Sequence, residues 1–189
     1  MKILLSVFAF LLLTFTVKAQ FMDNEYGEVI PLSKTPKYKN IIKTSTVKTC
    51  YLKCHNNDSL NKALNKNFNC EAYIGGITID TLINLKSAAT RYKIDIGTIW
   101  LFRIESYTAK MLDIVINPLV IPEGAYICIF PREEELKTKG PRLYFKKRIV
   151  RPQFVEFVYG NQLYIEYFEP NLVDKKANII ISEIGYGFR

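Results

Sequence analysis

From about residue 75 onward the chain consists of short apolar runs separated by turn-forming residues, and this rhythm constrains the fold more than any other feature. We expect strands at 77–80, 82–85, 99–104, 111–116, 125–130, 143–145, 154–159, 163–168 and 178–184. Pro and Gly interrupt the series at Asn117-Pro118, Gly140-Pro141 and Glu169-Pro170. Short strands at this spacing are typical of an antiparallel sandwich. The sequence therefore predicts an all-β fold, an antiparallel β-sandwich preceded by a Cys-containing, partly irregular N-terminal leader.

The first nineteen residues have the layout of a signal peptide. Lys2 precedes an apolar run from Ile3 to Val17, and Val17-Lys18-Ala19 is a small-residue cleavage site. The run is too short for a membrane span, which needs roughly 20 apolar residues. We expect a signal peptide at 1–19, the leader at 20–74 and the sandwich domain at 75–189. The protein is thus predicted to be exported, whether secreted, periplasmic or on the cell surface, with no membrane span.

The chain is basic. Its net charge of +8 becomes +6 without Lys2 and Lys18. Such a charge suits an anionic surface polymer or an acidic partner, but the charges are scattered among acids, which also fits simple solubility. No nucleic-acid-binding motif is present, so nucleic acid is not an expected partner.

Four cysteines lie beyond the signal segment. Cys50, Cys54 and Cys70 cluster in the leader, and in an oxidising compartment we expect one disulfide among them, with Cys70 as the preferred partner. Together with His55 the three thiols also have the composition of a zinc site, the less favoured alternative. Cys128 lies in an apolar run and is either a further partner or a buried free thiol.

The leader offers little regular structure. Residues 21–49 have few large apolar residues in rhythm, and we expect an extended, partly disordered segment. A short helix is predicted at 58–64, capped by Asp58 or Ser59, with Leu60 and Leu64 four residues apart.

Catalytic patterns are absent from the sequence. His55 is the only histidine, and neither Gly-x-Ser-x-Gly nor Gly-Asp-Ser-Gly occurs. The acidic run 133–135 lies near lysines and is interpreted as a solvated hairpin tip. We therefore expect that this chain alone is not an enzyme, with no catalytic, metal or cofactor site.

Two sets of residues are candidates for binding. The first is basic and is either a solvated strand edge or a docking surface for an acidic partner; it comprises Lys139, Arg142, Lys146, Lys147, Arg148 and Arg151. The second is aromatic and is either sandwich core, the favoured interpretation, or a sugar-binding face; it comprises Trp100, Phe102, Tyr164 and Tyr167. Asp113 lies inside an apolar strand and needs a hydrogen-bond partner if buried, with Arg103 as our candidate.

An ordered set of short motifs resembles a known family. It comprises Trp100 to Ile104, Ile121 to Ala125, Gly140-Pro141, Gly160 to Pro170 and the terminal Gly185 to Arg189. This set resembles the N-terminal pro-region of secreted trypsin-like serine endopeptidases of the lysyl endopeptidase type, in a Bacteroidetes-like setting. In that family the pro-region is a β-sandwich, and the protease domain follows it.

The resemblance implies a non-catalytic domain that assists the folding of a protease domain or inhibits it, the protease being joined to this chain or encoded apart. None of the family's catalytic residues has a counterpart in this sequence, and the cysteine-bearing leader departs from the family pattern. The alternative is a stand-alone exported binding module for a glycan or a peptide, using exposed aromatic residues or a sheet edge.

Overall fold

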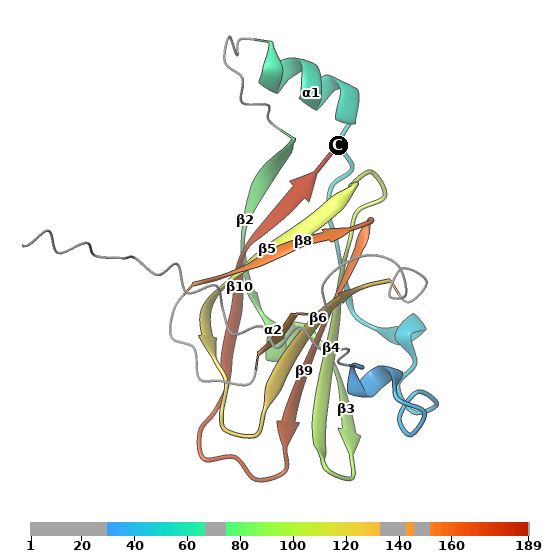
Figure 1. Ribbon diagram of the computed structural model, residues 1–189, viewed down its shortest axis with the longest axis vertical. Coiled ribbons are helices and arrows are strands. Elements are labelled where there is room, and N and C mark those ends of the chain that lie inside the picture. The colour runs from blue at the N-terminus through green and yellow to red at the C-terminus, as the bar shows by residue number, and fades with distance from the viewer. Residues whose placement is uncertain (1–29, 67–74, 133–142, 146–151, 189) are drawn as a thin grey trace, which may run out of the picture.

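The chain folds into two β-sheets that enclose one core (Figure 1). The computed structural model describes residues 30–66, 75–132, 143–145 and 152–188. Sheet A has the order β1 (Thr49–Tyr51), β4 (Gly97–Glu105), β9 (Gln162–Pro170), β6 (Tyr126–Pro131), β7 (Leu143–Phe145), and β3 (Thr90–Ile94) also pairs with β4. Sheet B has the order β2 (Gly76–Asn84), β10 (Asn178–Gly187), β5 (Met111–Val120), β8 (Gln153–Tyr159). The structure is mostly β in this part of the chain, as the sequence predicts. All pairings are antiparallel except that of β1 with β4.

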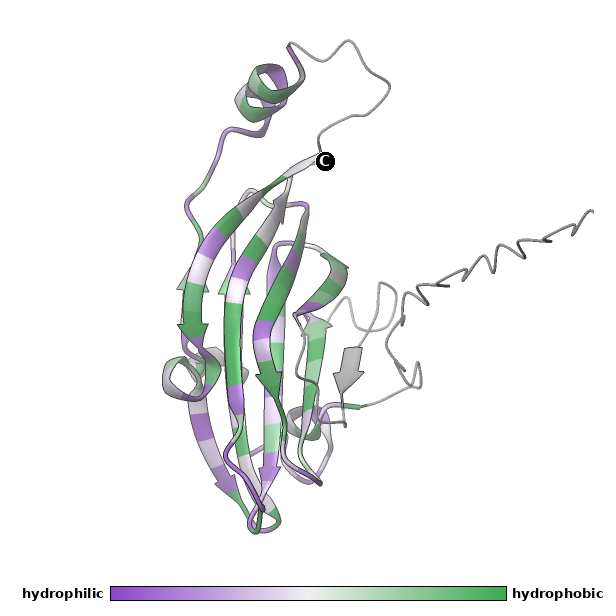
Figure 2. Ribbon diagram, turned by 90° about the vertical axis from the view of Figure 1, so that its left-hand side faces the viewer, coloured by the Kyte–Doolittle hydropathy of each residue, from purple (hydrophilic) through white to green (hydrophobic). Residues whose placement is uncertain are grey.

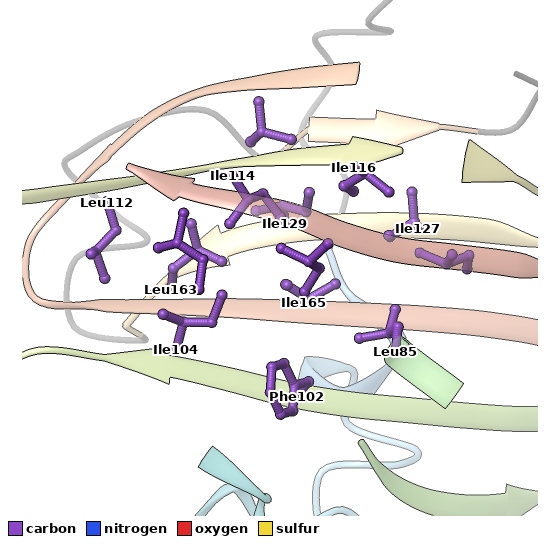
Figure 3. Packing of buried hydrophobic residues seen from close by; sticks show 14 of the residues in the cluster. Leu85, Phe102, Ile104, Leu112, Ile114, Ile116, Ile127, Ile129, Leu163 and Ile165 are labelled. Carbon is purple, nitrogen blue, oxygen red and sulfur yellow. The ribbon is translucent and has the colours of Figure 1, made fainter. Parts of the chain in front are cut away.

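Alternation along the strands decides which side chains enter the core, and hydrophobic and hydrophilic residues alternate visibly along several strands in Figure 2. In β4 the predicted set Trp100, Phe102 and Ile104 faces the core between the sheets. From sheet B, Leu112, Ile114 and Ile116 of β5 reach the same core. Figure 3 shows these three side chains in one cluster with Phe102 and Ile104 of β4. Full burial of each such side chain contributes about 1.5–3 kcal/mol, so this shared core holds the sheets together.

A second core lies on the opposite face of sheet A, beneath residues 31–47 of the leader. Tyr38, Ile42 and Val47 are buried there against strand residues that include Leu101 and Phe130. The segment runs through two 3-10 turns, Leu32–Lys34 and Thr44–Thr46. The expectation of an extended, partly disordered leader is therefore wrong for residues 30–47, because three well-spaced apolar side chains pack this turn-rich segment onto an apolar sheet face.

The predicted short helix is confirmed as α1 (Asn57–Asn65). Its cap differs from the expectation, because Asn56 rather than Asp58 or Ser59 accepts a hydrogen bond from the Ser59 backbone N–H. A second short helix, α2 (Leu85–Ala88), follows β2 and seals one end of the core with the fully buried Leu85.

Three of the four cysteines fall within the described residues. Cys50, Cys54 and Cys128 form no disulfide with one another, and Cys128 is buried. Cys70 lies outside the described residues, so a disulfide to Cys70 stays a prediction. The predicted signal peptide also lies outside them, and no helix in the part of the chain that the structure describes is long and apolar enough to cross a membrane.

Candidate docking edge

The basic residues predicted to form a docking surface, Lys139, Arg142, Lys146, Lys147, Arg148 and Arg151, all lie outside the described residues, as does the acidic run 133–135. In the sequence they lead directly into β8, because Arg151 precedes the first residue of that strand by two positions. Strand β8 is therefore where the structure bears on the docking hypothesis.

Strand β8 forms one margin of sheet B (Figure 1). Within the described chain, β5 is its only hydrogen-bonded neighbour in the sheet. Three large side chains on it are exposed: Phe154 at 52%, Phe157 at 46% and Tyr159 at 56%. The rings of Phe154 and Phe157 meet edge to face with centroids 6.0 Å apart. Proteins usually guard strand edges with charge or shortness, so an aromatic edge is a candidate binding surface.

A register shift explains why all three aromatic residues are exposed. Val155 and Val158 enter the shared core, and they pair with Ile114 and Leu112 across a shift in the β5–β8 ladder. Two core residues spaced three apart, rather than two, require one extra residue between them. That extra residue carries Phe157 to the solvent side along with Phe154 and Tyr159.

The outer face of sheet B continues from this edge into β5. Phe154 pairs with the half-buried Val115, and Tyr159 pairs with the half-buried Met111. The neighbouring Asp113 is buried, and its burial raises the pKa of the carboxyl from 3.8 to about 6, with a hydrogen bond from the Gly185 backbone opposing the rise and the Glu183 charge adding to it. The aromatic margin thus borders a carboxyl that is costly to ionise.

Arg103 is not the partner of Asp113, contrary to expectation. It lies in sheet A, where its Nε donates to Thr49 Oγ1 at 2.9 Å and faces Glu105 at 3.3 Å. The presence of a polar residue in a strand does not show which sheet the strand joins, so the sequence could not reveal that Asp113 and Arg103 belong to different sheets. The backbone of Gly185 supplies the hydrogen bond instead.

The four aromatic residues considered as a sugar-binding face are all buried. Trp100, Phe102 and Tyr167 lie in the core between the sheets, which confirms the core interpretation for these three, whereas Tyr164 is buried in the second core beneath the leader. Trp100 is covered by Lys86, whose ammonium lies 4.4 Å from the ring centroid and forms a bifurcated ion pair with Glu169 at 2.9 Å. These rings are held in place by packing and charge, and they offer no open face.

His55 lies beside Tyr186, with ring centroids 5.2 Å apart. Its backbone N–H donates to Thr108 Oγ1, and the Tyr186 hydroxyl lies 2.6 Å from Asn57 Oδ1 and 2.7 Å from Thr108 Oγ1. This polar network ties the segment before α1 to the end of β10. Within residues 30–66, 75–132, 143–145 and 152–188, no three His, Cys, Asp or Glu side chains are grouped so that they could hold a metal ion.

Sequence reasoning placed a strand at 154–159 but did not identify its aromatic residues as a surface. The signal was present as three aromatic residues in six positions, and only the register shift shows on which side they lie. Comparison of the chain with protein-family models, curated proteins and solved structures finds no match.

Proposed function

We propose that this chain is an exported, non-catalytic antiparallel β-sandwich that docks another protein through the aromatic edge of β8. The observation that carries this proposal is the exposure of Phe154, Phe157 and Tyr159 along one strand margin. The sandwich description is supported by the single core to which both sheets contribute.

The chemistry of this edge suits a folded protein partner. Aromatic side chains are enriched among the residues that dominate binding energy, because they bury large rigid surfaces at low entropic cost. The half-buried Val115 and Met111 extend the apolar area inward from the margin. The basic run that precedes β8 would favour a partner with an acidic rim by steering the encounter.

The partner class we infer is a trypsin-like serine protease domain, either on the same polypeptide or on another one. This inference rests on the motifs between Trp100 and Arg189 that resemble the pro-regions of lysyl endopeptidases. A domain that binds the native protease in preference to its unfolded form would assist folding by mass action. A domain that covers the active-site cleft of the protease would also inhibit the protease.

A second candidate is capture of an extended peptide, since β8 has a backbone margin that no other described strand occupies. A peptide could pair there as an additional strand. A glycan-binding role has less support, because Trp100 and Tyr164 are buried.

Inhibition of a lysine-specific trypsin-like endopeptidase tests the proposal. The purified protein should slow cleavage of a lysyl substrate, and the double variant Phe154→Ser/Phe157→Ser should lose at least tenfold in inhibition. The matched control is Leu82→Ser/Leu172→Ser, which removes two leucines that are 83% and 92% exposed. Leu82 lies in β2, at the opposite end of sheet B from β8, and Leu172 lies in the loop after β9. Equal potency of all three proteins, or no inhibition and no binding by the folded protein, would sink the docking role. Binding of extended peptides alone would replace it with the second candidate.

A further inference from the structure

A separate feature lies on the far side of the molecule from sheet B, in the leader segment that covers sheet A. Between residues 30 and 57 the sequence contains six lysines and no acidic residue. Two 3-10 turns and the intervening bend fold this segment back on itself. Lysines that are spread along the sequence are thereby brought around one depression.

The depression has a volume of about 230 Å³. It is lined by Ser33, Lys34, Lys39, Ile42, Lys43, Thr44 and Ser45. The lining residues thus include three lysines and three hydroxyl-bearing residues, and no Asp or Glu of the described chain is among them. The volume is below the roughly 300–1,000 Å³ of pockets that take drug-sized ligands, so it suits a small group rather than an extended molecule.

Ser33 gives the second, independent observation. It is only 1% exposed, and among the residues that the structure describes its Oγ has no hydrogen-bond partner. A buried hydroxyl without a partner costs about 1–3 kcal/mol, and such groups are rare in folded proteins. A ligand with acceptor oxygens in the depression would supply the missing partner.

The backbone N–H of Ser33 already donates a hydrogen bond to Glu166, so the hydroxyl is the group of Ser33 that a ligand could bind. The Ser33 N–H donates to Glu166 Oε2 at 2.9 Å beneath the segment, and the Leu32 N–H donates to Glu166 Oε1 at 2.8 Å. Glu166 itself is fully buried and is not part of the lining. These bonds fix the turn that carries Ser33, so the site is held by the fold rather than by loose side chains.

We propose that this depression binds a tetrahedral oxyanion, a phosphate or sulfate group, with the ammonium groups of Lys39 and Lys43 and the hydroxyl of Ser33 among its ligands. Charge-assisted hydrogen bonds from lysine to such oxygens are stronger than neutral ones. Lys34 adds positive charge to the lining, and its ammonium lies 5.9 Å from the Tyr164 ring centroid. The site is independent of docking at β8, which belongs to the other sheet.

Thermal unfolding of the purified protein with inorganic phosphate, inorganic sulfate or a monosaccharide phosphate, each against sodium chloride at equal ionic strength, tests the proposal. Specific binding raises the melting temperature in a saturable way. The variant Lys39→Gln/Lys43→Gln should weaken the apparent affinity about tenfold or more. The control Lys48→Gln/Lys53→Gln changes the charge of the same segment equally but leaves the lining intact, and it should bind like the unmodified protein.

Ser33→Ala separates a ligand role from a structural one, because alanine keeps the backbone bond to Glu166. Without anions this variant should be at least as stable as the original protein, and with phosphate it should gain less. Stabilisation by the inorganic ions alone would identify a free ion as the ligand, and equal or tighter binding of the ester would identify a phosphorylated or sulfated larger molecule. Absence of any effect beyond sodium chloride, or equal weakening by the Lys48/Lys53 control, would overturn the site.

Discussion

Replacing Glu166 should loosen the start of the leader from sheet A, because its carboxylate accepts hydrogen bonds from two leader amides. Glu166 is fully buried in β9. It accepts hydrogen bonds from the Leu32 N–H at 2.8 Å, from the Ser33 N–H at 2.9 Å and from the Tyr126 hydroxyl at 2.8 Å. Three donors around one buried carboxylate satisfy the requirement that a buried charge be fully hydrogen-bonded.

The magnitude follows from these bonds. A hydrogen bond to a charged group contributes about 1.5–3 kcal/mol. The three bonds to Glu166 do not add up fully, because contributions within one network are not additive; removing one partner of a buried charged pair typically costs about 3–5 kcal/mol. We expect Glu166→Ala to lower the free energy of unfolding by about 3–5 kcal/mol. Glu166→Gln keeps one acceptor but turns an amide toward N–H and O–H donors, so we expect a smaller loss of about 1–3 kcal/mol.

Two measurements check this prediction. Urea unfolding gives the change in stability, and amide hydrogen exchange at Leu32 and Ser33 reports whether the leader is still attached. Both amides should lose protection in Glu166→Ala. Tyr126→Phe is the matched control: it removes one donor and leaves the carboxylate, so protection at Ser33 should persist. If Glu166→Ala unfolds like the original protein and both amides stay protected, the carboxylate does not anchor the leader and the reasoning is refuted.

Three further substitutions test the packing around β10. The pKa of Asp113 is raised to about 6 in the folded protein, so the free energy of unfolding should fall as the pH rises from about 4 to 6. Asp113→Asn should abolish this slope in urea titrations and raise the free energy of unfolding by about 2–3 kcal/mol at pH 7. Gly185→Ala should destabilise the protein by more than about 1 kcal/mol in the same assay, since a Cβ there would collide with the Asp113 carboxylate. Tyr186→Phe should cost about 1–2 kcal/mol and increase hydrogen exchange in α1, because the Tyr186 hydroxyl holds Asn57 at 2.6 Å; unchanged exchange in α1 would contradict that link.

The strands of both sheets were largely predictable because their residues are β-branched or aromatic and are bounded by Pro and Gly. Strands β1 and β3 were missed. Thr49–Tyr51 is only three residues long and pairs in parallel with β4, and Thr90–Ile94 alternates with charged residues at the edge of the sheet. Both depend on the position of β4, which is a tertiary feature that no local pattern contains.

The aromatic edge of β8 and the attachment of the leader to Glu166 were not predictable for a similar reason. Strict alternation puts Phe154 and Phe157 on opposite faces of β8, and the register shift against β5 places both on the outside. Glu166 meets its donors across 133 and 134 positions of sequence. These two donors lie in a segment with no strand or helix signal in the sequence.

Site-specific photo-cross-linking tests the docking proposal most directly. A photo-reactive amino acid would replace Phe157 on the exposed edge, or Leu172 in the loop after β9 as the control, in the culture that produces the protein, and cross-linked peptides would be identified by mass spectrometry. Our account predicts that position 157 attaches to a trypsin-like catalytic domain, on the same or a separate polypeptide, while position 172 does not. Absence of protease peptides from the position 157 adduct, or the same adducts from both positions, would contradict it.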